Sequence, residues 1–445
     1  MISCDIIIIG AGPGGYRTAE YAAKNGLKVV IFEGEHVGGT CLNVGCIPTK
    51  TYVHATSFEE AVERQPQVVE QLRSGVETLL SHPNITLVRE KGRFADANTV
   101  EGCTSGDRFT APNIIIATGS ETKWLPLPDL TDPHLVDSTG LLQLKQQPKR
   151  LAIIGAGVIG MEFASVFNRF GTEVTVIEYL KECLPALDSD IAKRLRKTME
   201  RQGVAFNMQC AVKAVEGGAV VFERKGKTES IDADVILMAT GRKPRTEGLG
   251  LETLGITLAP NGAIPVDDNY QVISCSSPLA PCSSHLYAIG DANGKQMLAH
   301  AAEMQAIHAV NHILGKKDNI RFDIMPAAIF TTPEAACVGP TEDQLKAQGI
   351  AYECKKSFWR ANGKALAMNE TEGMLKLFHS PLTSHLSPHE TPGLILGCHA
   401  YGAHSADIIQ EVSVLMCKNT TIDELRDMVH IHPTLGEILL TAVES

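Results

Sequence analysis

Residues 5–33 read DIIIIGAGPGGYRTAEYAAKNGLKVVIFE, and this stretch decides the fold of the N-terminal part of the chain. It contains an apolar strand, a glycine turn, a helix and a second strand that ends at Glu33. Gly10 permits a tight bend, Gly12 lets a pyrophosphate approach the backbone, and Gly15 lets helix and strand pack closely. Phosphates bind at the helix N-terminus, and the acid accepts hydrogen bonds from a ribose 2′-OH. The stretch therefore predicts a dinucleotide site.

The same plan occurs a second time in residues 150–178, RLAIIGAGVIGMEFASVFNRFGTEVTVIE. Gly155, Gly157 and Gly160 take the glycine positions, and Glu178 takes the acidic one. In both copies the acid lies 23 residues after the first glycine. A single G-x-G-x-x-G pattern is a weak signal, but strand, turn, helix, strand and acid in register twice is a strong one.

Two further segments echo this duplication. IIIATGS ends a strand at residues 117–119, ILMATGR ends another at 239–241, and each follows one of the glycine motifs. The segment LYAIGDAN then places Asp291 after another strand. Two dinucleotide sites in one chain indicate that electrons pass between two carriers.

The composition is that of an ordinary globular protein of about three domains, at roughly 150 residues each. The chain has 445 residues, of which 44% are hydrophobic, and a net charge of −11. It has no Lys/Arg tract, so nucleic acid and anionic membranes are not expected as partners. No apolar run is long enough to span a bilayer, and the first residues do not resemble a signal peptide. We expect a cytoplasmic location.

Two of the twelve cysteines lie in an unusual local sequence, GGTCLNVGCIPTK at residues 38–50. Cys41 and Cys46 are separated by five positions, and the other ten cysteines show no metal-binding spacing. A disulfide between them would close a loop too short to stabilise the fold appreciably, so it is better suited to storing electrons. Cys275 and Cys282 are expected in a surface loop rather than in a second redox pair.

These motifs together resemble the flavoprotein disulfide reductases over nearly the whole chain. The resemblance implies that the first glycine motif binds FAD and the second a nicotinamide dinucleotide. It also implies that Asp291 holds the ribityl or pyrophosphate part of FAD. The helix that begins near residues 297–300, MLAH, would direct its positive end at the flavin. Glu178 would repel a 2′-phosphate, and no arginine follows at once, so NAD is favoured over NADP.

The same resemblance assigns roles around the two cysteines. Cys41 would exchange with the substrate, and Cys46 would face the flavin as the charge-transfer thiol. A helix N-terminus at this place would lower a thiol pKa. Lys50 would lie near the flavin and pair with Glu162.

The segment MVHIHPTLGE near the C-terminus supplies the expected acid–base pair. Thiol exchange needs a base to take the substrate proton. By resemblance His432 is that base and Glu437 orients it, whereas His430 is expected to be structural. In this family the histidine serves the cysteines of the other subunit, which implies a homodimer with shared active sites. We also expect a cis bond between His432 and Pro433.

The expected function is that of a dihydrolipoyl dehydrogenase, which oxidises a protein-bound dihydrolipoamide and reduces NAD+. CLNVGCIPTK, MLAH, RANGKALAMNETEGMLKL and HIHPTLGE all resemble that group. The partner would be a lipoyl-bearing protein of a 2-oxo acid dehydrogenase or glycine cleavage complex. The segment between Lys50 and Gly92 is shorter than is usual in the family, which leaves the substrate size open. The alternatives are an NAD(P)H-dependent reductase of another disulfide, a quinone or a metal ion, and a non-catalytic flavin-bearing sensor subunit.

We therefore expect an α/β fold with two Rossmann-like domains and a C-terminal α+β interface domain. The expected domains are residues 1–147 for FAD with the redox disulfide, 148–268 for NAD, 269–322 returning to the FAD domain, and 323–445 for the interface. No metal site is expected. The candidate cofactor-binding residues are Gly10, Gly12, Gly14, Gly15, Glu33, Gly39, Thr40, Lys50, Ala117, Thr118, Gly119, Asp291, Met297, Leu298, Ala299, His300, Gly155, Gly157, Val158, Ile159, Gly160, Glu178, Ala239, Thr240, Gly241 and Arg242.

Overall fold

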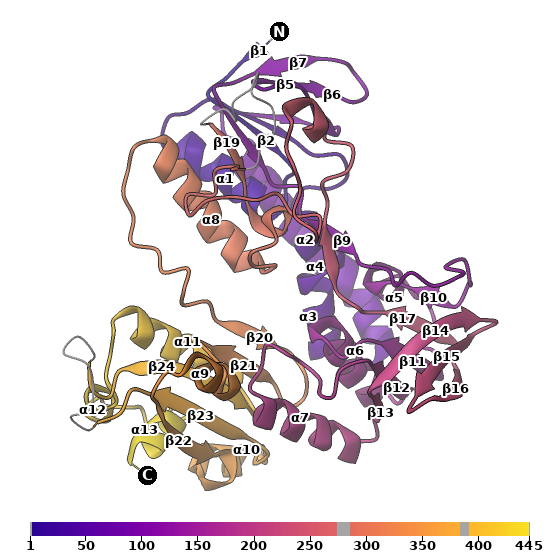
Figure 1. Cartoon of the computed structure of the whole chain (residues 1–445), viewed down its shortest axis with the longest axis vertical. Coiled ribbons are helices and arrows are strands. Elements are labelled where there is room, and N and C mark those ends of the chain that lie inside the picture. The colour runs from indigo at the N-terminus through magenta and orange to yellow at the C-terminus, as the bar shows by residue number, and fades with distance from the viewer. Residues whose placement is uncertain (1, 274–284, 383–390, 445) are drawn as a thin grey trace. The chain divides into compact units, whose positions relative to one another are not determined.

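The computed structural model describes residues 2–273, 285–382 and 391–444 (Figure 1). Cys275 and Cys282 lie outside the described residues, so their expected place in a surface loop stays a prediction. The chain divides into two compact units. Unit 1 comprises residues 1–124, 138–145 and 241–320, and unit 2 comprises residues 125–137, 146–240 and 321–445.

Unit 1 is built on a five-stranded parallel sheet with the order β19-β8-β2-β3-β4. Its central strand β2 is fully buried, as its four consecutive isoleucines require. Helices α1 and α8 pack against each other (Figure 1). The bounds are β2 Ile6–Ile9, α1 Pro13–Lys24, β3 Val29–Phe32, β4 Ile85–Val88, β8 Asn113–Ile116, β19 Leu286–Ala288 and α8 Ala299–Ile313.

The remaining elements of unit 1 surround this sheet. A small sheet has the order β1-β7-β6-β5, and a two-stranded ribbon pairs β18 with β9. Helices α2 and α3 contact the long helix α4, which has Pro66 in its interior. The bounds are β1 Ile2–Ser3, α2 Gly39–Val44, α3 Cys46–His54, α4 Phe58–Leu80, β5 Gly92–Asp96, β6 Thr99–Gly102, β7 Arg108–Thr110, β9 Ser120–Thr122, α5 Ser138–Leu142, β18 Arg242–Pro244, η1 Leu251–Leu254 and η2 Gly290–Asn293.

Unit 2 contains a second parallel sheet, with the order β10-β17-β11-β12-β13. An antiparallel meander, β14-β15-β16, follows it. The parallel sheet with its glycine turn and helix repeats the strand–turn–helix–strand plan of unit 1, as the duplicated motif predicts. The bounds are β10 Leu135–Val136, β11 Arg150–Ile154, α6 Val158–Arg169, β12 Glu173–Glu178, α7 Ser189–Arg201, β13 Ala205–Met208, β14 Cys210–Glu216, β15 Ala219–Arg224, β16 Lys227–Asp232 and β17 Val235–Met238.

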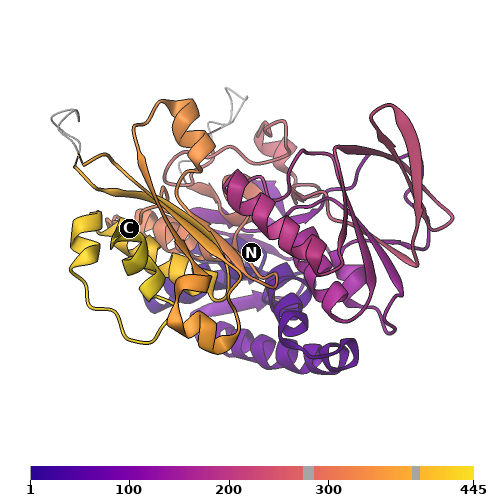
Figure 2. The ribbon, with the colours of Figure 1, turned by 90° about the horizontal axis from the view of Figure 1, so that it is seen from below.

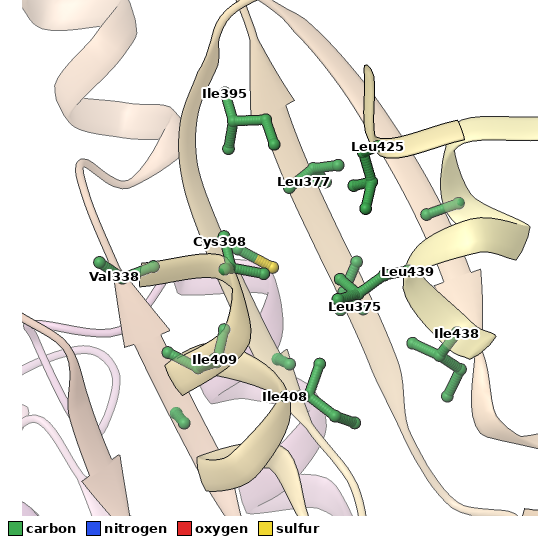
Figure 3. Close-up of a cluster of buried hydrophobic side chains, with 14 of the residues drawn as sticks. Val338, Leu375, Leu377, Ile395, Cys398, Ile408, Ile409, Leu425, Ile438 and Leu439 are labelled. Atoms are coloured by element: carbon green, nitrogen blue, oxygen red, sulfur yellow. The ribbon is translucent and has the colours of Figure 1, made fainter. Parts of the chain in front are cut away.

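The C-terminal part of unit 2 is a five-stranded antiparallel sheet, β20-β21-β24-β23-β22, with helices α11 and α13 on one face (Figure 2). Leu439 of helix α13 lies beside Leu375 of β23 in an apolar core that also holds Cys398 (Figure 3). Truncation of such a leucine to alanine typically costs about 2–5 kcal/mol. The bounds are β20 Ala327–Ile329, β21 Ala335–Val338, α9 Glu342–Gln348, β22 Glu353–Phe358, η3 Trp359–Ala361, α10 Gly363–Met368, β23 Met374–His379, β24 Ile395–Tyr401, α11 Ser405–Cys417, α12 Ile422–Arg426 and α13 Glu437–Glu444.

A buried ionic cluster joins the start of α7 to this antiparallel sheet. The Lys376 ammonium, 2% exposed, lies 2.7 Å from Asp188 Oδ1 and 2.6 Å from Glu342 Oε2. The backbone N–H of Asp188 donates to His399 Nδ1 at 3.0 Å, and burial lowers the pKa of His399. Burial alone would lower the pKa of Lys376, but its two carboxylate partners raise it. Lys376 is therefore charged in the interior, where both Asp188 and Glu342 pair with it.

Candidate active site and dinucleotide sites

The first glycine turn is shaped to receive a pyrophosphate. Gly10 has φ +101°, and a methyl group at Gly15 would overlap the carbonyl oxygen of Gly10. At Gly12 a methyl group would meet only Gly39 Cα, at 3.9 Å, and no side chain caps helix α1. The Glu33 carboxylate accepts a hydrogen bond from Ala11 N at 2.8 Å, which fixes the turn. These features fit the phosphates of FAD at the helix N-terminus.

The second turn repeats this geometry in unit 2. Gly155 has φ +106°, a methyl group at Gly160 would overlap the Gly155 carbonyl, and the space beside Gly157 is open for 4 Å. Buried Glu178 accepts hydrogen bonds from Ala156 N at 2.5 Å and Leu180 N at 2.7 Å. The turn and its acid fit a nicotinamide dinucleotide with a free 2′-OH.

A polar chain in unit 1 leads to Asp291, in η2. Arg242 donates to Ser120 Oγ at 2.7 Å, and Ser120 in turn donates to Asp291 Oδ2 at 2.5 Å. Burial raises the pKa of Asp291, and the Ser120 hydrogen bond opposes this increase. Arg242, expected from its motif to serve a dinucleotide, thus lies in unit 1 together with Asp291.

The other candidate cofactor-binding residues lie at strand ends and helix starts. Ala117, Thr118 and Gly119 follow β8, and Met297 and Leu298 precede α8. Ala299 and His300 begin α8, Gly14 is in α1, Gly39 and Thr40 are in α2, Lys50 is in α3, Val158 and Ile159 begin α6, Ala239 and Thr240 follow β17, and Gly241 precedes β18. Their contacts with the cofactors stay predictions.

The two cysteines lie on two successive helices rather than on one. Cys41 is in α2, Cys46 is the first residue of α3, and Gly45 separates the helices. A methyl group at Gly45 would come within 2.9 Å of the Thr40 carbonyl oxygen, so this close turn requires glycine.

The side chains of Cys41 and Cys46 are in hydrogen-bond contact. The Cys46 sulfur is the largest cause that raises the pKa of Cys41, burial adds to it, and Lys50 opposes it. Cys46 is exposed and stands at the N-terminus of a helix, a position that favours thiolate. The contact with Cys46 and burial therefore favour the protonated form of Cys41.

Arg73, on α4, is a residue that the sequence alone did not indicate. Its Nε and Nη2 both donate to Asn43 Oδ1, at 2.9 and 2.8 Å, and its side chain is 25% exposed. Asn43 lies between the two cysteines and donates to the carbonyls of Gly39 at 2.8 Å and Val37 at 3.0 Å. Arg73 thus anchors the loop and helix that carry Cys41.

Tyr16 is a second residue near Cys41 that was not predicted. Its hydroxyl donates to Glu303 Oε1 of α8 at 3.1 Å. Burial raises the pKa of Tyr16, and the charges of Glu303 and of Cys41 raise it further. The phenol stays protonated, and Cys41 is close enough for the charge of its thiolate to act on the pKa of Tyr16. Its position directly after Gly15 gave no hint of this, because the residue is not part of the glycine pattern.

His432 and Glu437 form a hydrogen-bonded pair in unit 2. His432 Nδ1 lies 2.9 Å from Glu437 Oε1, and the histidine side chain is 79% exposed. The cis bond expected between His432 and Pro433 is present. His430, by contrast, has only 8% of its side chain exposed and lies 3.2 Å from Glu411. Glu437 engages Nδ1 of His432, so the base role predicted for this histidine would fall to Nε2 and stays a prediction.

Lys50 and Glu162 belong to different units, so their pairing stays a prediction. Lys50 lies one helical turn after Cys46 in α3. Glu162 in α6 is 4% exposed and accepts a hydrogen bond from Phe330 N at 2.9 Å. This bond links the dinucleotide helix to the strand region at the start of the C-terminal sheet.

These features define a class of protein: one with two dinucleotide-binding folds, a cysteine pair beside the first, and a C-terminal dimerisation sheet. Comparison with protein families agrees. The model for pyridine nucleotide-disulphide oxidoreductases matches residues 4–306, and that for their dimerisation domain matches residues 325–443. The chain belongs to the pyridine nucleotide-disulphide oxidoreductases.

Individual relatives narrow the comparison. The dihydrolipoyl dehydrogenase of Geobacillus stearothermophilus is 36% identical, over 100% of this chain and 96% of its own. Dihydrolipoyl dehydrogenase 3 of Pseudomonas putida is 36% identical, over 99% of this chain and 98% of its own length. The Cu(II) complex of the HOCl-induced flavoprotein disulfide reductase RclA from Escherichia coli has a TM-score of 0.89 and 30% identity, over 100% and 99%.

The expected family, fold class and cofactors are confirmed. The chain is an FAD-dependent, NAD-linked disulfide oxidoreductase. The dimerisation domain supports a homodimer. In the described ranges, no helix is long and apolar enough to cross a membrane. Among the same residues, no three His, Cys, Asp or Glu side chains are grouped to hold a metal ion.

Proposed function

We propose that this enzyme oxidises a protein-bound dihydrolipoamide to lipoamide and reduces NAD+. The observation that carries the proposal is the contact of Cys41 with Cys46, in which Cys46 raises the pKa of Cys41. This asymmetry suits a pair in which one sulfur exchanges with the substrate and the other stays a thiolate. Two dihydrolipoyl dehydrogenases at 36% identity support this choice of substrate.

The thiol chemistry divides between two groups of residues. In the oxidised enzyme, His432 of the partner subunit takes a proton from the first substrate thiol, and the resulting thiolate attacks Cys41. The Cys41–Cys46 bond breaks, and Cys46 leaves as a thiolate. The second substrate sulfur then displaces Cys41, which keeps the proton of that thiol, and the lipoyl disulfide closes. The enzyme is left with Cys41 as a thiol and Cys46 as a thiolate.

FAD, when bound, relays the two electrons of this pair to NAD+ as a hydride. Cys41 and Cys46 return to the disulfide. Of the two protons held by Cys41 and His432, one is carried in the hydride and the other is released. Lys50, one turn after Cys46, holds positive charge beside the thiolate. The net change is one dithiol and NAD+ to one disulfide, NADH and a proton.

An anaerobic titration tests this proposal. Addition of dihydrolipoamide to the holoenzyme should produce a long-wavelength thiolate-to-flavin absorbance band. Addition of NAD+ should then remove the band and yield NADH. A Cys46→Ser variant that keeps FAD but still turns over lipoamide at the wild-type rate would contradict the mechanism.

A second candidate is an NADH-dependent reductase of a small disulfide or of a metal ion. RclA, similar over the whole chain at 30% identity, was solved as a Cu(II) complex. The short link of three residues between α3 and α4 also leaves the substrate approach open to a different ligand. Oxidation of NADH by Cu(II) or a small disulfide, without turnover of dihydrolipoamide, would favour this candidate. The lipoyl-bearing partner complex and the cytoplasmic location stay predictions.

A further inference from the structure

A cavity of about 750 Å³ lies in unit 2 between the second half of α7 and the antiparallel sheet. This volume is within the usual range of small-molecule sites, about 300–1,000 Å³. Its lining residues are Arg194, Lys197, Glu200, Arg201, Phe358, Arg360, Thr371, Glu372, Gly373 and Tyr401. Four of these are basic and two are acidic, in a chain whose net charge is −11.

Both acids of the cavity are already engaged. Glu372 lies 3.0 Å from the guanidinium of Arg201 and accepts a hydrogen bond from Tyr401 at 2.9 Å. Burial, followed by this hydrogen bond, raises the pKa of Tyr401 to about 12, so its hydroxyl remains a donor. Glu200 pairs with Arg196, which lies outside the lining. The carboxylates thus do not neutralise the other cations of the cavity.

Two of those cations are not paired with an acid in the part of the chain that the structure describes. Within the described ranges, neither Lys197 nor Arg360 lies within 4.0 Å of a carboxylate oxygen, whereas Arg194 pairs with Asp190 at the surface. The guanidinium of Arg360 lies 4.5 Å from the ring centre of Phe358, which restrains its plane. A restrained planar guanidinium can donate two parallel hydrogen bonds to a phosphate. Thr371, an exposed residue, adds a hydroxyl group to the lining.

The cavity is separate from the expected NAD site. Strands β12 and β13 are parallel, so α7, which connects them, runs in the opposite direction. Its second half therefore approaches the amino ends of the strands. The glycine turn and Glu178 lie at the carboxyl ends, where ligands of such sheets bind.

We propose that this cavity binds a small molecule that carries a pyrophosphoryl group. Lys197 and Arg360 supply the two uncompensated charges, and Thr371 supplies a neutral donor. The concave shape favours a small molecule over a macromolecular surface. The proposal does not depend on which disulfide the enzyme uses.

Calorimetric titration of the FAD-loaded enzyme with inorganic pyrophosphate, first without NAD+ and then with NAD+ present to detect competition, tests this site. Saturable binding is expected, with a tenfold or greater loss of affinity in Lys197→Gln and in Arg360→Gln. Lys193→Gln is the matched control, because Lys193 is exposed on the same helix but does not line the cavity. A second series with ADP distinguishes free pyrophosphate from a nucleotide source, because only a nucleotide site binds ADP more tightly.

Absence of saturable binding of both probes would overturn the proposal. An equal loss of affinity in all three variants would overturn it as well, because it would show nonspecific attraction to the basic helix. FAD content and the visible spectrum of each variant establish that it is folded. Loss of dihydrolipoamide turnover in the wild type would leave this binding result unaffected, so the two proposals fail separately.

Discussion

Glu437 holds His432 with one carboxylate oxygen and the backbone with the other. Its Oε1 lies 2.9 Å from His432 Nδ1, and its Oε2 accepts a hydrogen bond from Thr434 N at 2.8 Å. The Thr434 hydrogen bond, followed by that of His432, lowers the pKa of Glu437. The carboxylate is therefore ionised throughout the neutral range and engages Nδ1 of His432, so Nε2 is the nitrogen left for the predicted base role.

Replacement of His432 by Gln should reduce dihydrolipoamide turnover by about 10²–10⁴-fold, the usual contribution of a general base. Glu437→Gln should cause a smaller loss, because the amide keeps a hydrogen bond but loses the charge. Steady-state assays across pH 6–9 check both. His430→Gln is the control for a nearby histidine, and an equal loss there would contradict the assignment of the base to His432.

Cys46→Ser should make Cys41 more acidic. Because Cys46 is the largest cause of the raised pKa of Cys41, its removal should bring that pKa down towards the ordinary thiol value. Alkylation of Cys41 by iodoacetamide should therefore begin at lower pH in this variant than in the reduced wild type. Mass spectrometry of the labelled peptides separates Cys41 from the exposed Cys103 and Cys417. An unchanged pH profile of Cys41 labelling would exclude the coupling.

Arg73→Ala should lower stability and slow thiol exchange together. Loss of a hydrogen bond from a charged donor costs about 1.5–3 kcal/mol, and Asn43 would no longer be held on that side. Arg73→Lys should retain only part of the stability and of the exchange rate, because one ammonium group cannot reproduce the fork of guanidinium donors. Urea unfolding and stopped-flow reduction by dihydrolipoamide measure the two effects.

Arg89→Ala is the matched control for Arg73→Ala. Arg89 pairs with Glu77, which lies on α4 as Arg73 does, but the Arg89 side chain is 65% exposed. A surface change of this kind alters stability by about 0.5 kcal/mol or less. If Arg73→Ala behaved as Arg89→Ala does in both measurements, the anchoring role of Arg73 would be wrong.

Local patterns account for what the sequence could predict. The two glycine turns, the cysteine motif and the His432–Glu437 pair each lie within a short segment, so spacing alone places their members together. Arg73 and Asn43 are 30 positions apart, and Lys376 and Asp188 are 188 apart. Nothing in a local pattern reports such contacts, because they depend on which helix packs on which strand. The break between α2 and α3 at Gly45 likewise depends on close backbone packing, which a local residue pattern does not report.

The Lys376 cluster should make the enzyme sensitive to acid in a predictable range. Lys376 is the first cause that lowers the pKa of Glu342 to about 2, below its ordinary 4.5. A carboxyl group whose pKa is depressed in the folded state stabilises the fold fully above its pKa in the unfolded state. The contribution of Glu342 is therefore present above pH 4.5. It is lost as the pH falls towards 2. The thermal unfolding temperature of the wild type should therefore fall as the pH decreases over this range. That of Glu342→Gln should fall less.

Lys376→Met tests the same cluster at neutral pH. Removal of one member of a buried ion pair leaves an uncompensated charge, which typically costs about 3–5 kcal/mol. The expected result is a large fall in the urea midpoint at pH 7. A double variant, Lys376→Met with Glu342→Gln, should recover part of the loss, because one of the two unpaired carboxylates is then neutral. Additive losses in the double variant would show that Lys376 and Glu342 do not interact.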